Sequence, residues 1–236
     1  MTRTMLPIDA AVRATMLARE QRGGVQASPT LPYVTISRQA GAGGRTLAQQ
    51  LQSKLNELDR ADPPWMAFDR ELVEKVAQDH RISKTLVEMV EDASHSWLKD
   101  MLTGLSFSGR NEPTEIMVYR RVAATVRALA QAGRAILVGR GSVYITHDIP
   151  GGVHVRLVAP FEHRVAHMAE LEGVSDHDAA ERVREIDHNR QVFYKRHWPG
   201  KSQSSEAFTI TLNTAQVSDD ALVEAILPLV QLPVRS

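Results

Sequence analysis

The sequence predicts a three-layer α/β fold built on a five-stranded parallel sheet. Short runs rich in β-branched and aromatic residues alternate with longer stretches whose apolar residues recur at helical spacing, as in βαβ units. The first such run leads directly into a glycine-rich turn and then into a leucine-striped segment. With 236 residues, the chain has the length of one substantial α/β domain carrying an insertion.

Five segments are expected to form the strands, and they are residues 33–37, 65–69, 135–139, 153–159 and 208–212. A helix is expected directly after the glycine-rich turn, because leucines recur there at positions 47, 51, 55 and 58. Ser175, with Asp178 three residues later, predicts the start of another helix that runs to the neighbourhood of Trp198. Ser218 and the two aspartates after it predict the start of the last helix.

The domain boundaries follow from where these patterns begin and break. Residues 1–30 contain one short amphipathic stretch and a linker-like segment, and we interpret them as an appendage that is partly helical or flexible. Residues 31–236 then form a single domain. A largely helical block over about residues 71–132 is too long for a simple crossover, which predicts an inserted subdomain.

Composition argues against several classes of function. The 28 basic residues offset the 28 acidic ones, so no broad surface for nucleic acid or acidic membranes is expected. The chain has no cysteine, which excludes disulfides and thiolate metal sites and suits a reducing compartment. No apolar run is long enough to span a bilayer, and the first residues do not have the pattern of a secretory signal, so we expect a cytoplasmic protein. The sequence leaves the oligomeric state open.

The glycine-rich turn has the features of a phosphate-binding loop without its usual lysine. Gly41, Gly43 and Gly44 allow backbone N–H groups to converge on an anion at the start of a helix, and Thr46 offers a hydroxyl for Mg²⁺. In one alignment to such loops Arg45 takes the lysine position, and in a shorter-loop alignment Gly44 does. The missing cation would then come from Arg45 or from Arg38. The alternative is that the glycines only permit a tight turn.

The chain from Pro32 to about Leu229 resembles the cytidylate kinase-like family of P-loop proteins. The resemblance rests on the order and spacing of four segments, which are ISRQAGAGGRTLAQQL (36–51), FDRELVEKVA (68–77), ILVGRGSVYI (136–145), and DHNRQVFYKRHW (187–198) followed by TLNT (211–214). It implies a P-loop NTPase-type fold with a helical acceptor-side insertion and a helical lid over about residues 175–206. It also implies an enzyme that transfers the ATP γ-phosphoryl group to a nucleoside monophosphate such as CMP or dCMP, with Mg²⁺ as cofactor. ATP and a small nucleotide acceptor are then the expected partners.

The resemblance also assigns roles to individual residues. Phosphate binding is expected from Arg38, Gly41, Ala42, Gly43, Gly44, Arg45 and Thr46, with Thr46 on Mg²⁺. Acceptor binding is expected from Asp69, Arg70 and Arg140, which follow strands at their carboxyl ends, where open α/β sheets bind ligands. The lid residues are expected to be Arg182, Arg184, Asp187 and Arg190. Of all these, Arg45, Asp187 and Arg190 are the expected catalytic residues, since phosphoryl transfer depends on positioning and charge neutralisation.

Some residues have a simpler structural interpretation. Asp69 can also cap the helix expected at Glu71, and Asn213 can serve only to stabilise the turn after the last strand. The aromatic residues Phe193, Tyr194 and Trp198 are expected to pack the lid or its hinge rather than a base. We expect His163 and His167 to be solvated on a surface helix that also contains Arg164.

Two departures from the family pattern leave the acceptor open. The D-G-R-D segment of cytidylate kinases is replaced here by Val138-Gly-Arg-Gly141, so the acid that helps to read cytosine is absent. A kinase of another small acceptor therefore stays an alternative. So does a catalytically weak or inactive nucleotide-binding regulatory module, because the loop lysine is missing.

Overall fold

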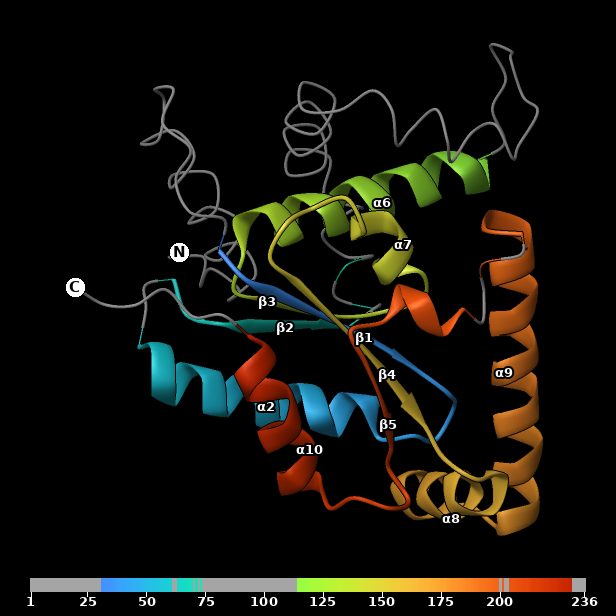
Figure 1. Ribbon diagram of the computed structural model, residues 1–236. Coiled ribbons are helices and arrows are strands. Elements are labelled where there is room, and N and C mark those ends of the chain that lie inside the picture. The colour runs from blue at the N-terminus through green and yellow to red at the C-terminus, as the bar shows by residue number, and fades with distance from the viewer. Residues whose placement is uncertain are drawn as a thin grey trace, which may run out of the picture.

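The computed structural model describes residues 31–60, 63–69, 71, 73, 114–199, 201 and 204–230. They form a three-layer α/β fold with five parallel strands between helices (Figure 1). The strands are β1 (Tyr33–Arg38), β2 (Met66–Asp69), β3 (Ala135–Val138), β4 (Gly152–Val158) and β5 (Ile210–Asn213). The predicted fold class is therefore confirmed, and the predicted strand bounds lie within two residues of the observed ones. The predicted appendage, most of the predicted insertion, and Arg70 lie outside the described residues.

The sheet has the order β2-β3-β1-β4-β5, so β1 lies at its centre. Val34 is in register with Ile136 of β3 and with Val153 of β4, and all of the strand pairs are parallel. A central parallel strand is buried on both faces, which explains the nearly continuous apolar character of β1. The carboxyl ends of β1, β2 and β3 consequently meet at one edge, where the ligands of open α/β sheets bind.

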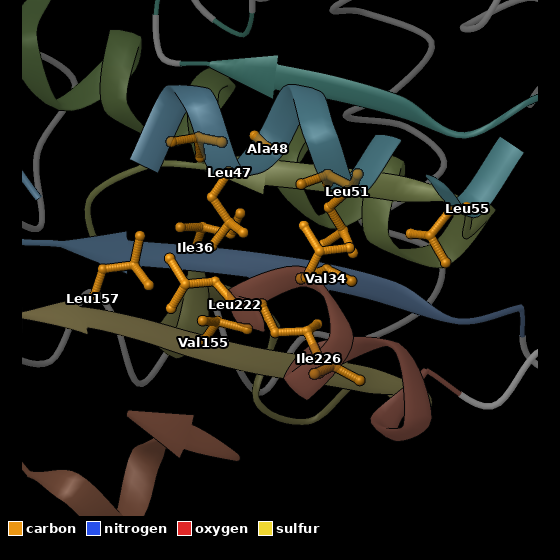
Figure 2. Close-up of a cluster of buried hydrophobic side chains, with 14 of the residues drawn as sticks. Val34, Ile36, Leu47, Ala48, Leu51, Leu55, Val155, Leu157, Leu222 and Ile226 are labelled. Atoms are coloured by element: carbon orange, nitrogen blue, oxygen red, sulfur yellow. The ribbon is translucent and has the colours of Figure 1, made fainter. Parts of the chain in front are cut away.

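One face of the sheet is covered by α2 (Gly44–Asp59) and α10 (Asp219–Ile226). Figure 2 shows leucines of α2 packed over Val34 and Ile36 of β1, with residues of α10 beside them. The predicted leucine stripe was wrong at Leu58, which is 54% exposed. The buried stripe follows a spacing of four residues, so its last member is Asp59, which accepts from Trp65 Nε1 at 3.1 Å and from Arg134 Nε at 2.7 Å.

The other face is covered by α6 (Thr114–Ala132) and by the short helix α7 (Ser142–Thr146), which pack with Tyr33, Phe68 and Leu137 in a second apolar cluster. The sequence interpretation did not include α7. Inside this layer, the buried Arg127 donates to Asp148 at 2.6 and 2.8 Å.

Two helices, α8 (Phe161–Glu172) and α9 (Asp176–His197), lie beyond the carboxyl ends of β1 and β4 (Figure 1). The predicted cap of α9 is confirmed, because Ser175 Oγ accepts from the backbone N–H of Asp178 at 3.1 Å. Ser218 likewise caps α10, and two 3₁₀ turns, η1 (Ser205–Ala207) and η2 (Leu227–Leu229), complete the described elements. Val165 and Met168 of α8 pack with Ala179 and Val183 of α9, which fixes the first half of α9 against α8.

Candidate functional site

The glycine-rich loop joins β1 to α2 with two residues in the left-handed conformation. Gly41 has φ 75° and Gly43 has φ 73°, which glycine adopts without strain. No side chain caps α2 and its first turn has no acidic residue, so the first N–H groups and the positive end of the helix dipole suit an anion. The residues predicted to bind phosphate lie in this loop, at the end of β1 or in the first turn of α2, and they are Arg38, Gly41, Ala42, Gly43, Gly44, Arg45 and Thr46.

Arg164 of α8 and Asp187 of α9 hold the loop through its backbone, and we call this pair the loop clamp. Arg164 Nη1 donates to the carbonyl oxygen of Ala40 at 3.0 Å and to Asp187 Oδ2 at 2.6 Å. Asp187 Oδ1 accepts from the backbone N–H of Ala40 at 2.8 Å. Arg164 Nε donates in addition to the carbonyl oxygen of Ala159. The clamp therefore joins α8 and α9 to the loop at Ala40.

The prediction that His163 and His167 are both solvated on a surface helix was wrong for His167. Arg164 is only 7% exposed, and His167 Nδ1 lies 2.8 Å from the carbonyl oxygen of Gly41. Because a carbonyl can only accept, this contact places the proton on Nδ1. His163 is exposed, as expected. The overlooked signal was spacing, since Arg164 belongs to the same helical stripe as the apolar residues at 161, 165 and 168.

Three arginines gather next to the loop, at the carboxyl edge of the sheet. Arg190 Nη1 donates to the carbonyl oxygen of Arg38 at 2.9 Å and lies 3.7 Å from Asp187 Oδ1. Burial, together with the neighbouring charges of Arg190 and Arg140, lowers the pKa of Arg38 to about 10. Burial also lowers the pKa of Arg190. Both guanidinium groups are positive at neutral pH although they are largely buried. Burying a charge costs free energy, and an anion bound beside these arginines would offset that desolvation cost.

Two pockets open beside these arginines and share Arg38 and Arg190 in their linings. The first, of about 420 Å³, is also lined by Arg156 and Lys195. The second, of about 450 Å³, is also lined by Arg140 and Arg196, with no acidic side chain among the described residues of its lining. Arg38 thus lies between two basic pockets, an arrangement suited to two phosphorylated ligands that approach each other.

Arg45 lies on the outer side of the first turn of α2. Its side chain is 73% exposed, and its Nη2 lies 3.1 Å from Oδ2 of Asp69 at the end of β2. Thr46 is half-buried in the same turn. Mg²⁺ in phosphoryl-transfer sites is held by one or two protein oxygens and by substrate phosphates, and the Thr46 hydroxyl and the Asp69 carboxylate are oxygen donors of that kind.

The four predicted lid residues do not all lie at the loop. Asp187 and Arg190, in the second half of α9, contact the backbone of residues 38–40. Arg182 instead forms an ion pair with Glu172, and Arg184 lies over the ring of Phe161 at 4.8 Å. These two arginines therefore interact with α8.

The end of α9 carries an aromatic cluster made of Phe193, Tyr194, His197 and Trp198 with Tyr119 of α6 and Tyr144 of α7. Arg140 lies over the Phe193 ring at 4.6 Å. Burial and the charges of Arg196 and Arg140 lower the pKa of His197 to about 4, so its imidazole is neutral at pH 7. The rings pack against one another, as the sequence interpretation expected.

Gly141, which stands where cytidylate kinases have the base-reading acid, is in contact with this cluster. Its φ is 75°, and a Cβ there would lie 2.3 Å from the indole ring of Trp198. Its backbone N–H donates to the hydroxyl of Tyr194 at 3.2 Å. The space that a side chain at this position would need is thus filled by Trp198.

Asn213 Oδ1 accepts from the backbone N–H of Ala215 at 3.1 Å, so it stabilises the turn after β5. Within the described ranges, histidine and acidic side chains do not cluster in a way that would hold a metal ion by themselves. None of the helices in the described part of the chain combines the length and apolar character needed to cross a membrane.

Comparison with known proteins agrees with this architecture. A protein of uncharacterised function from Eubacterium ventriosum superposes with a TM-score of 0.64 at 19% identity, covering 84% of this chain and 97% of its own. Weaker superpositions, both with a TM-score of 0.45, are to a shikimate kinase from Bacteroides thetaiotaomicron (14% identity; 85% and 99% covered) and a gluconokinase from Sinorhizobium meliloti (10%; 86% and 93%). No curated protein matches the sequence. The profile of the cytidylate kinase-like family matches residues 33–216, and the chain therefore belongs to that family.

Proposed function

We propose that the protein is an ATP- and Mg²⁺-dependent kinase that phosphorylates a nucleoside monophosphate. The observation that carries the proposal is the convergence of the uncapped start of α2, the left-handed glycines 41 and 43, and the arginines 38, 140 and 190 at one edge of the sheet. Phosphoryl transfer requires such a set of positive groups, because the transferred group and both its neighbours carry negative oxygens. Family membership supports the same reaction class.

In the proposed reaction the loop and the start of α2 bind the donor phosphates, while Arg140, with Asp69 and Arg70, binds the acceptor. The bond between the γ-phosphorus and the bridging oxygen of ATP breaks, and a new bond forms to a phosphate oxygen of the acceptor. The products are ADP and a nucleoside diphosphate. Because the attacking oxygen is already an anion, no general base is needed. Mg²⁺ supplies charge neutralisation at the donor phosphates and would be held by Thr46.

The loop clamp gives Asp187 a positioning role in this scheme. Its carboxylate fixes Arg164 and the Ala40 N–H, and Arg190 reaches the end of β1 one turn further along α9. Arg190, already at the end of β1, would then lie beside the transferred group.

The test is incubation of the purified protein with Mg·ATP and a panel of nucleoside monophosphates that includes CMP and dCMP. We expect ADP and one diphosphate product in equal amounts. ATP binding without a diphosphate product across the panel would rule out the proposed reaction and favour a nucleotide-binding regulatory module.

A kinase of a different small acceptor is the second candidate. Trp198 fills the space beside Gly141, where an acid would read cytosine in related kinases, and the adjoining pocket is lined by arginines 38, 140, 190 and 196. Such a pocket suits a compact phosphorylated acceptor. Transfer to small phosphorylated metabolites in place of nucleotides would identify this function.

A further inference from the structure

Gly44 takes the lysine position in the shorter-loop alignment. Its backbone conformation does not require glycine. It is the first residue of α2, and it is not among the residues with positive φ in the described structure. A Cβ at this position would lie 3.1 Å from Cγ and 3.2 Å from Cδ of Arg38. Both distances are tighter than ordinary carbon contacts. The aliphatic part of Arg38 therefore crosses the first turn of α2 at the point where a lysine side chain would begin.

The guanidinium of Arg38 extends from there to the centre of the site. Arg38 lines both basic pockets. The charged groups that act on it are Asp69, Arg140 and Arg190, which come from the end of β2, the loop after β3, and α9. This location lies between the glycine-rich loop and the groups assigned to the acceptor.

Arg45, the other candidate for the missing cation, is engaged elsewhere. Its side chain is 73% exposed and its guanidinium forms an ion pair with Asp69. A charge in water and already paired with a carboxylate contributes little to binding a further anion.

We propose that Arg38 supplies the phosphate-binding charge that the loop lysine supplies elsewhere, and that glycine at position 44 leaves room for the Arg38 side chain. Lysine at 44 and arginine at 38 are then alternative ways to place one cation at the same phosphate group. The proposal rests on the proposed function for the identity of that phosphate, but it is tested by binding alone.

The experiment measures the dissociation constants of Mg·ATP and of inorganic triphosphate by calorimetry, for the wild type and five variants. Arg38→Ala should weaken both ligands about tenfold or more, the usual effect of losing one charged hydrogen bond. Gly44→Ala should weaken them as well, because its Cβ displaces Arg38, but should add nothing in an Arg38→Ala background. Arg38→Ala with Gly44→Lys should recover most of the affinity, since the remaining Cβ of residue 38 lies at 3.5 Å, an ordinary contact.

Arg60→Ala is the matched control, since it removes an exposed arginine just beyond the far end of α2 and should leave both constants unchanged. Circular dichroism of each variant verifies folding, and Arg38→Gln replaces Arg38→Ala if the latter does not fold. The proposal is overturned if Arg38→Ala binds within twofold of the wild type, if Gly44→Ala weakens binding equally in both backgrounds, or if lysine at 44 recovers nothing. If the wild type binds triphosphate but phosphorylates no acceptor, the proposed function fails while these binding results still decide the role of Arg38.

Discussion

Replacing Asp187 by alanine tests the loop clamp. The change removes the acceptor of the Ala40 N–H and leaves the Arg164 guanidinium, whose side chain is 8% exposed, without its carboxylate. Breaking a buried pair by removing one partner costs about 3–5 kcal/mol, and Asp187 is itself 24% exposed, so we expect the lower end, about 3 kcal/mol. For a chain of this size such a loss lowers Tm by about 6–12 °C.

The assay is urea unfolding followed by circular dichroism, with Arg182→Ala as the control. Arg182 also forms an ion pair on α9, with Glu172, but its side chain is 53% exposed, so its loss should cost less than about 1 kcal/mol. Adding Arg164→Met to Asp187→Ala should recover part of the stability, because the unpaired buried charge is removed. A loss of stability in Asp187→Ala no larger than that in Arg182→Ala would contradict the structural role of the clamp.

Three further predictions concern stability, each measured by urea unfolding. Gly41→Ala and Gly43→Ala both force alanine to a φ above 70°, which costs about 1–2 kcal/mol of stability. Only at position 41 would the new Cβ also lie 2.3 Å from a carbonyl oxygen of α8, so Gly41→Ala should destabilise the protein clearly more. Equal losses of stability would contradict the loop geometry. Burial lowers the pKa of His154 to about 4. Between about pH 6.5 and 4 the unfolded chain therefore binds a proton that the folded chain does not. The free energy of unfolding should decrease as the pH is lowered through this window, by less than about 1.4 kcal/mol per pH unit. His154→Asn should flatten that slope, and an unchanged slope would remove His154 as its cause. Gly141→Ala should cost less in a Trp198→Ala background, which removes the indole that the Cβ meets, and equal costs would mean that the ring does not occupy that space.

The sheet and its main helices were predictable because their signals are local. The order of strands and leucine-rich helix follows from residue periodicity, and Ser175 and Ser218 cap their helices as their spacing suggests. The glycine-rich loop was recognisable for the same reason. Its two left-handed glycines, Gly41 and Gly43, lie within one short segment of the sequence.

What the sequence did not reveal depends on contacts between distant segments. Arg164 looks like one more charge on a surface helix until α9 brings Asp187 against it, 23 residues along the chain. Arg38 and Arg45 were equal candidates for the missing cation, and only the contact of Arg38 with Gly44 and the pairing of Arg45 with Asp69 distinguish them. Such pairings are set by the tertiary fold, which periodicity and spacing do not encode.

In the proposed function, the glycine-rich loop and the start of α2 bind the phosphates of ATP. The most direct measurement is titration of ¹⁵N-labelled protein with Mg·ATP, followed through the backbone amide resonances. We expect the largest shifts on Gly41, Gly43, Gly44 and Thr46, because their N–H groups would bond to phosphate oxygens. Saturable binding that leaves these amides unshifted while others move would contradict it.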